Sequence, residues 1–454
     1  MAMTLQRVFN VRRAEILPVA LAVVFFFCVL TALMMLRPAR EALGMRGGLD
    51  AVRWLFVGTA LVTLGVNPIF GWLVSRFRRM VFISATYLFF AFSLTVFYLL
   101  IAVTPDAIGV VSGQVFYVWF SVFNLFSSMV FWALMSDRFS LEQSKRFFGL
   151  IAVGGTLGAI CGPWLASLLA KPLGTPALLL VSSGFLLLAL CAAGALVHVQ
   201  PAQPALGRDG RPQPRKEGKE GKEGVIGGGA WDGIKAVCQS RYLLGIASYV
   251  VILAIMATFL YFTRLQMVAA LGDAVDMRTT LFAQIDMITQ IATLVIQVLI
   301  SGHLMKRLGV HITLALLPLT TLLGFAGLAL VGSLAALIVF EAAFRAVQRA
   351  IMRPARETLF TVVSAEDKYK AKAFVDTFVY RAGDVAGAQL EGALGRLGMG
   401  LVAVASVAMP LAIVWAALAL WLGRAQQRMA VFTPAPDDSV DLPLSAHLDK
   451  GVST

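Results

Sequence analysis

Residues 16–41 read ILPVALAVVFFFCVLTALMMLRPARE, an apolar run that ends in two arginines and a carboxylate. An apolar run of about 20 residues is long enough to cross a lipid bilayer as an α-helix. The closing pentapeptide, Arg37–Glu41, occurs again as Arg353–Glu357, also at the end of an apolar segment. Charge placed there is costly unless it is paired or faces a water-filled cavity, and it commonly marks a substrate or ion pathway.

The rest of the chain follows the pattern of this first segment. Of its 454 residues, 59% are hydrophobic and 14% are charged, whereas a soluble protein carries about 25% charged residues. The sequence therefore predicts an all-α polytopic membrane protein with about 12 transmembrane helices. The predicted spans are 16–36, 54–74, 80–102, 109–135, 147–170, 177–198, 242–263, 279–301, 310–331, 334–352, 373–394 and 398–423.

The net charge of +13 has a topological explanation. Basic residues gather in alternate loops, for example at 76–79, 145–146, 306–307 and 368–372. This is the positive-inside pattern, and it places both termini in the cytoplasm. No nucleic-acid partner is needed to explain the charge. No small-residue cleavage site follows the first apolar run, so we expect a retained helix of a multi-pass protein.

A polar, repetitive stretch divides six predicted spans from six. It contains four prolines and three Lys-Glu-Gly units between residues 201 and 224, a composition that cannot bury enough apolar surface to fold. We therefore predict four parts: an N-terminal six-helix half (1–198), a flexible cytoplasmic linker (199–241), a C-terminal six-helix half (242–428) and a disordered cytoplasmic tail (429–454).

The two halves show weak internal similarity. The turn at 71–76, Gly-Trp-Leu-Val-Ser-Arg, is matched by Gly-His-Leu-Met-Lys-Arg at 302–307. Both turns resemble the loop signature of the major facilitator superfamily. That resemblance implies two inverted three-helix repeats per half and a midplane substrate site lined by spans 1, 4, 7 and 10. Gly158 and Gly162 resemble half of the superfamily's antiporter signature, or they serve close helix packing.

Span 10 is the most polar predicted membrane segment. Glu341, Arg345 and Arg349 are spaced four residues apart and fall on one helix face. That face lines the cavity or belongs to a structural ion-pair network. The partners and coupling residues that we expect are Asp286, Glu341, Asp376 and Asp384, with Arg381 beside them.

Arginine predominates over lysine at these positions. Its planar guanidinium matches phosphate and carboxylate oxygens and is always charged, which predicts a small anionic solute as substrate. The predicted substrate-binding residues are Arg37, Arg40, Glu41, Arg345, Arg349, Arg353, Arg356, Glu357 and Arg381. Span 4 carries aromatic and amide side chains: Gln114, Tyr117, Trp119, Asn124 and Trp132. They either recognise a nucleobase by stacking and amide contacts or serve helix packing.

Several stretches resemble the ATP/ADP translocases of intracellular bacteria and plastids and their free-living bacterial relatives. They are 36–43, 136–149 and the run from Arg353 through Ala365–Lys372 to Asp384. The resemblance implies a nucleotide transporter, possible ATP/ADP exchange and a bacterial inner (cytoplasmic) membrane location. It aligns Arg40 with a functionally important lysine of the family, Arg356 with the lysine of the family's second motif, and Glu357 with the glutamate of that motif. Arg353 departs from the family, which has an acid there.

Two alternatives stay open beside nucleotide transport. One is a proton-coupled carrier of another small organic anion or drug, with Asp286 or Glu341 as the protonated group. Another is a lipid flippase on the same fold. An enzyme is not expected, because the sequence has no phosphate-loop motif, no His-Glu-x-x-His and only four histidines. We expect no metal, no cofactor, four free cysteines and a monomer in the lipid bilayer.

Overall fold

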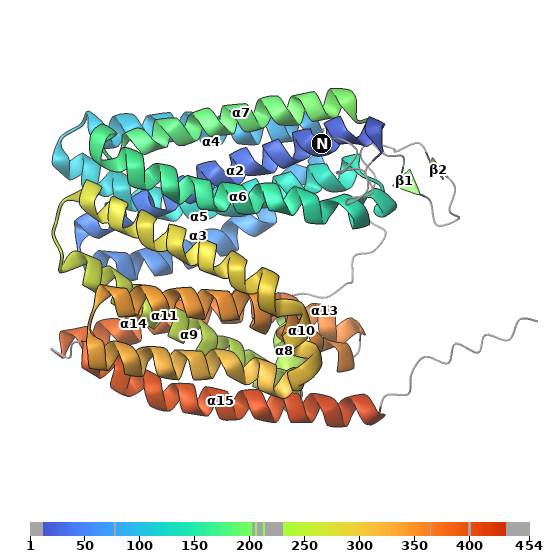
Figure 1. Ribbon diagram of the computed structural model, residues 1–454, viewed down its shortest axis with the longest axis vertical. Coiled ribbons are helices and arrows are strands. Elements are labelled where there is room, and N and C mark those ends of the chain that lie inside the picture. The colour runs from blue at the N-terminus through green and yellow to red at the C-terminus, as the bar shows by residue number, and fades with distance from the viewer. Residues whose placement is uncertain are drawn as a thin grey trace, which may run out of the picture.

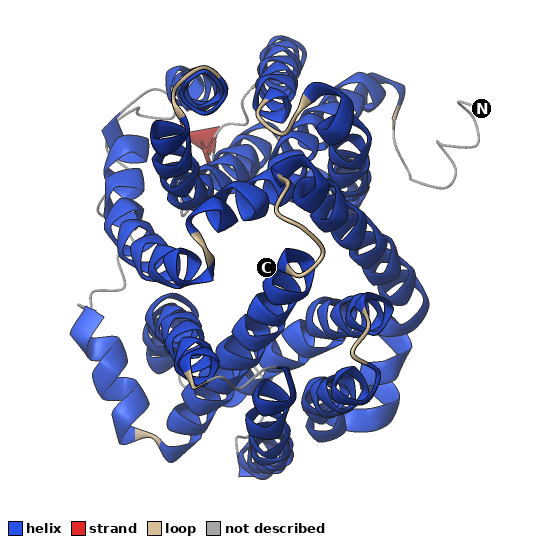
Figure 2. Ribbon diagram, turned by 90° about the vertical axis from the view of Figure 1, so that its left-hand side faces the viewer, coloured by secondary structure: helices blue, strands red, loops and turns tan. Residues whose placement is uncertain are grey.

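The computed structural model describes residues 12–76, 79–201, 205–206, 212–213, 230–363, 365–397 and 401–432. Almost all of them are helical (Figures 1 and 2). The first half of the chain forms η1 (Arg13–Glu15), α2 (Ile16–Gly44), η2 (Met45–Gly47), α3 (Leu49–Arg76), α4 (Arg79–Ala102), α5 (Asp106–Arg138), α6 (Leu141–Leu173) and α7 (Ala177–Val199). The second half forms α8 (Ala230–Gln239), α9 (Arg241–Ala269), α10 (Val275–Val331), α11 (Leu334–Val347), η3 (Gln348–Met352), α12 (Arg353–Thr358), η4 (Leu359–Val362), α13 (Ala365–Phe374), η5 (Val375–Val379), α14 (Tyr380–Arg396) and α15 (Leu401–Phe432).

Ten segments of the described chain are long and apolar enough to cross a membrane. Two of them are the two parts of α10, which bends at Gly309, where φ is 71°. The other two predicted spans, 334–352 and 373–394, are the helical courses α11–η3–α12 and α13–η5–α14. These two are the most charged courses, which is why composition alone does not mark them as membrane helices. The predicted all-α class with about twelve membrane helices is confirmed.

Successive helices run in alternate directions, so the molecule has two ends. The linker end holds the start of α2 and the end of α7, and it lies on the right in Figure 1. The far end holds the end of α2, the turn between α6 and α7, and the start of α10. Which end faces the cytoplasm remains a prediction from the charge pattern.

Each half of the chain has its own apolar core. In the first half it includes Phe25, Tyr87 and Phe131, and in the second Tyr249 and Trp415. Figure 1 shows the halves as two layers, α2–α7 above and α8–α15 below, except that the first part of α10 starts beside α6 in the upper layer and slants down to the lower one. Smaller clusters join them: Tyr117, Val52 and Met45 pack with Phe262 and Phe282, and Met35 and Ala39 pack with Ala283.

Glycines allow α6 to pack directly on the backbone of α2. A Cβ at Gly154, Gly158 or Gly162 would lie 2.5, 2.4 or 2.7 Å from the carbonyl oxygen of Val23, Phe27 or Thr31 respectively. These distances are too short for any side chain. The spacing of four residues is the small-residue pattern of close membrane helix pairs, so packing accounts for Gly158 and Gly162.

The start of α2 is tied to the start of α6 at the linker end. Burial alone would raise the pKa of Glu15, but the Arg12 N–H, Gln143 and Arg146 all donate to its carboxylate and hold the pKa below its ordinary value. Both contacts to α6 lie within the first half of the chain.

The predicted linker and tail differ from the structure at their edges. Residues 230–239 of the predicted linker form α8, and strands β1 (Ala205–Leu206) and β2 (Pro212–Gln213) pair within it. Helix α15 continues to Phe432, past the predicted start of the tail at 429. Residues 202–204, 207–211 and 214–229 of the linker and the tail after residue 432 lie outside the described residues.

Candidate functional site

A cavity of about 470 Å³ lies between the two halves. Its walls come from α2, α3 and α5 in the first half, and from α9, α11–η3–α12 and α14 in the second. Its lining residues are Leu33, Met34, Arg37, Arg40, Glu41, Phe56, Thr59, Tyr117, Phe120, Ser121, Asn124, Ala257, Thr258, Leu260, Tyr261, Glu341, Phe344, Arg345, Gln348, Arg349, Arg353, Tyr380, Arg381 and Asp384.

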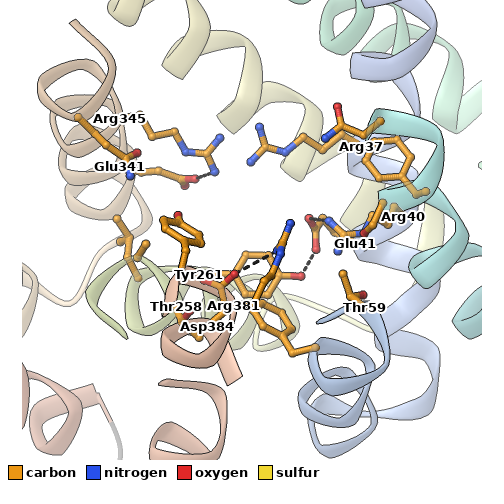
Figure 3. Close-up of a pocket in the computed structure, with 18 of the residues that line it drawn as sticks. Arg37, Arg40, Glu41, Thr59, Thr258, Tyr261, Glu341, Arg345, Arg381 and Asp384 are labelled. Carbon is orange, nitrogen blue, oxygen red and sulfur yellow. Dashed lines mark hydrogen bonds and ion pairs between the residues drawn. The ribbon is translucent and has the colours of Figure 1, made fainter. Parts of the chain in front are cut away.

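The cavity is strongly cationic. Six arginines and three carboxylates line it, which leaves a formal excess of three positive charges. Arg37 from α2 and Arg345 from α11 point toward one another across it (Figure 3). One carboxylate, that of Asp286 behind the wall, is shared between these two guanidinium groups at 3.6 Å from each. One of the two positive charges is left without a partner of its own, which favours a further anion in the cavity.

A buried ion-pair network underlies this wall. Arg264 of α9 is fully buried, and its guanidinium lies 3.0 Å from Asp286, 3.3 Å from Glu341 and 3.7 Å from Glu41. Asp286 also lies 3.6 Å from both Arg37 and Arg345. The network thus joins α2 of the first half to α9, α10 and α11 of the second.

A second polar connection crosses between the halves beside Arg40. The Tyr117 and Tyr261 hydroxyls are 2.8 Å apart, and Tyr261 donates to Glu41. Arg40 stacks on the Tyr117 ring at 3.7 Å from its centroid and donates to the Tyr117 carbonyl. Arg40 and Glu41 are themselves 3.4 Å apart. The first pentapeptide therefore lies inside α2 against the other half and not at an exposed helix end, as its position after the apolar run had suggested.

Three arginines of the second half have successively weaker partners. Arg345 pairs with Glu341 and Asp286, and Arg349 donates to the side-chain oxygen of Gln290 at 2.6 Å. Arg353 is exposed in the cavity wall and has no ion pair with any described residue. Uncompensated positive charge therefore increases along this wall toward the linker end.

A π-helical turn brings Arg353 onto the cavity face. In a regular α-helix Arg353 would lie about 120° around the axis from Glu341. In η3 the Arg353 N–H donates to the carbonyl of Gln348, five residues back. Such a turn accommodates one extra residue, which reduces the angle to about 20°. A similar turn, η5, precedes Tyr380, Arg381 and Asp384 in the neighbouring course.

Four predicted site residues do not line the cavity. Arg356 lies 3.0 Å from Asp376, and Lys372 pairs with Glu357, so these residues join α12 to the α13–η5 course nearer the linker end. Asp286 is buried behind the cavity wall. The second pentapeptide thus divides: Arg353 faces the cavity, whereas Arg356 and Glu357 point into a contact between helices.

The other predicted site residues all line the cavity: Arg37, Arg40, Glu41, Arg345, Arg349, Arg353, Arg381, Glu341 and Asp384. Arg381 and Asp384 pair with each other at 3.2 Å. Of the span 4 residues considered for base recognition, only Tyr117 and Asn124 line it. Trp119 packs on Phe90, Phe97 and Phe123 in the core of the first half.

The structure adds three residues that the sequence did not predict for the site: Arg264, Tyr261 and Gln290. Arg264 carried a signal that could have identified it, because it is a lone arginine that follows twenty-two mostly apolar residues from Tyr242. Tyr261 and Gln290 carried none, because polar and aromatic residues of this kind are common in membrane helices and only the folded arrangement brings them to the cavity.

Two six-helix halves around a central polar cavity define a membrane transporter of the alternating-access type. Residues 19–352 match the family model of the major facilitator superfamily, and the chain belongs to that superfamily. A search of curated proteins gave no match.

Solved structures agree with this fold. The nucleoside transporter NupG is similar with a TM-score of 0.58 and 13% identity, covering 91% of this chain and 99% of that one. The POT family transporter PepTSo gives 0.62 and 12%, with 90% and 98% covered. A bacterial homologue of the human lysosomal transporter Spinster, inward-facing and unoccupied, gives 0.53 and 12%, with 93% and 100% covered.

Proposed function

We propose that this transporter carries multiply charged phosphorylated anions, with nucleotides of the ATP and ADP type as its first candidates. The observation that carries the proposal is the excess of three positive charges in the cavity lining. Arginine forks bind phosphate oxygens in bidentate geometry. Arg349 and Arg353 have no carboxylate partner among the described residues, so an anion meets two guanidinium groups that need not be freed first.

The size and walls of the cavity fit such a substrate. A volume of about 470 Å³ lies in the range of small-molecule and cofactor sites. On the wall formed by the first half, Phe56 and Phe120 offer apolar surface and Asn124 offers an exposed amide. Arg40 lies beside them, 5.5 Å from the centroid of the Phe120 ring. A substrate with an anionic end and a planar, hydrogen-bonding body would use both walls.

The charge balance also favours exchange. An empty cavity must close around three uncompensated positive charges, which is costly in a low-dielectric site. A bound anion with three or four negative charges removes that cost. The loaded carrier therefore reorients more readily than the empty one, and uptake of one anion is tied to release of another.

A proton-coupled anion carrier is the second candidate. The hydrogen-bonded series Tyr117, Tyr261 and Glu41 favours it, because it connects the two halves through groups that can pass a proton. Asp286 suits the role less well than the sequence suggested, since a proton there would have to displace contacts with three arginines. Uptake abolished by an uncoupler and indifferent to internal anion would favour this candidate.

Uptake of labelled ATP and ADP into proteoliposomes tests the proposal. We expect internal nucleotide to stimulate uptake, and Arg349→Gln and Arg353→Gln to reduce it by about tenfold or more each, since a charge-assisted phosphate contact contributes about 1.5–3 kcal/mol. Arg46→Gln is the matched control, because Arg46 pairs with exposed Asp106 away from the cavity. Absence of uptake by correctly inserted wild-type protein would reject nucleotides as substrates.

A further inference from the structure

Two neighbouring helices form a ladder of polar contacts behind the cationic wall. Asp286 and Gln290 are four residues apart on α10, and Arg345 and Arg349 are four residues apart on α11–η3. Asp286 meets Arg345 at 3.6 Å, and Gln290 accepts a hydrogen bond from Arg349 at 2.6 Å. Leu294 follows Gln290 by four residues on α10, as Arg353 follows Arg349 by four residues on the neighbouring course. The residue of α10 that corresponds to Arg353 in this ladder is therefore apolar.

The two contacts differ in the charge of the partner, which is a carboxylate for Arg345 and an amide oxygen for Arg349. A carboxylate cancels the charge of the arginine that it holds, whereas an amide oxygen orients the guanidinium and leaves its charge intact. Gln290 is 9% exposed, so its contact with Arg349 is formed largely away from water. A glutamate would have the same length and could reach the same guanidinium.

We propose that Gln290 is a positioning and selectivity-determining residue of the anion site. It holds the Arg349 guanidinium against the cavity wall while preserving the positive charge that attracts the substrate. This assignment rests on the proposed transport of multiply charged anions. It further specifies that the preference for high anionic charge depends on an uncharged partner at position 290.

Gln290→Glu and Gln290→Met separate this role from simple packing. Glutamate keeps size and hydrogen bonding but neutralises Arg349, so we expect KM for ATP to rise by about tenfold or more. Methionine removes the hydrogen bond and keeps the charge of Arg349, so the expected increase in KM is smaller. The loss in Gln290→Glu should also be greater for ATP than for AMP, which bears fewer charges. Equal KM changes in the two variants, or equal losses for ATP and AMP, would overturn the assignment.

A second measurement reports the local charge without any substrate. Arg353→Cys, in a background with the four native cysteines replaced by serine, places a thiol in the cavity wall beside Arg349. Its reaction with an anionic thiosulfonate reagent is compared with its reaction with a cationic one. Gln290→Glu should lower the anionic-to-cationic rate ratio several-fold, and Gln290→Met should leave it nearly unchanged.

The two measurements distinguish failure of this assignment from failure of the proposed function. If wild type takes up no nucleotide but the ratio falls in Gln290→Glu, the substrate is wrong and the role of Gln290 is supported. If the ratio is the same with glutamine and glutamate at position 290, the assignment is overturned, even when nucleotide uptake is normal.

Discussion

At the scale of single residues, Arg264 is a centre of the buried ion-pair network beside the cavity, although the sequence did not indicate it. It is fully buried and contacts carboxylates from α2, α10 and α11. Removing one member of a buried ionic cluster leaves the others without compensation, which commonly costs about 3–5 kcal/mol. Here three carboxylates would lose their shared partner.

We therefore expect Arg264→Met to lower the free energy of unfolding by about 3–5 kcal/mol. Thermal unfolding in detergent, followed by circular dichroism, measures the change. Arg46→Met is the control, because its partner Asp106 is fully exposed and the expected change is within about 0.5 kcal/mol. Similar unfolding midpoints for the two variants would show that the network contributes little to stability.

The residues predicted for the cavity show what spacing can and cannot reveal. Four-residue spacing on one segment predicted that Glu341, Arg345 and Arg349 share a helix face, because that face depends only on helical periodicity. The positions of Arg356 and Asp376 depend on how two helices rotate against each other. Sequence contains no direct signal of that rotation, so their pairing away from the cavity could not be predicted.

At the scale of elements, departures from the regular helix decide where the charges point. The π turn η3 places Arg353 in the cavity, although ideal helical geometry would turn it aside. Nothing in the residues of η3 distinguishes it from an ordinary α-helical turn. A close contact of α6 with another helix, in contrast, was readable, because glycines four residues apart indicate a small-residue contact. The sequence did not indicate that the partner is α2.

The α2–α6 contact gives a prediction for a single methyl group. In Gly158→Ala the added Cβ would lie 2.4 Å from the Phe27 carbonyl oxygen, which forces the helices apart. We expect a loss of about 1–3 kcal/mol, although alanine is the better helix former by about 1 kcal/mol.

Gly149 in the same helix provides the control, since a Cβ there would meet no atom within 4 Å. Gly149→Ala should be neutral or slightly stabilising in the same thermal unfolding assay. A Gly158→Ala variant as stable as Gly149→Ala would contradict the packing role.

At the scale of the whole molecule, composition predicts the two-half architecture. It does not predict which contacts between the halves close the far end of the cavity. Apolar runs and a polar linker suffice to predict two six-helix units. The contacts between the halves that the structure describes lie at the far end and around the cavity. Arg53 meets Glu391 at 2.9 Å, and Thr175 meets Asp276 and Thr279 at 2.6 and 2.8 Å. Alternating access requires such contacts to break when the far end opens.

Arg53 and Glu391 give a direct test of this requirement, because both are buried and they belong to different halves. Arg53→Gln leaves Glu391 without its charged partner, which destabilises the closed far end by about 3 kcal/mol. The far-end-open population should rise about a hundredfold. The double variant Arg53→Gln with Glu391→Gln should destabilise the closed far end by less than the sum of the two single changes, because no buried charge is then left without a partner.

Cysteines at Thr175 and Thr279, whose hydroxyls are 2.8 Å apart, report closure through the yield of an oxidised cross-link. We expect that yield to fall in Arg53→Gln, to recover in part in the double variant, and to stay at the wild-type level in Arg46→Gln. If Arg53→Gln cross-links as efficiently as wild type, closure of the far end does not depend on this pair. The apolar cluster of Val52, Phe262 and Phe282 would then be sufficient to hold the halves together.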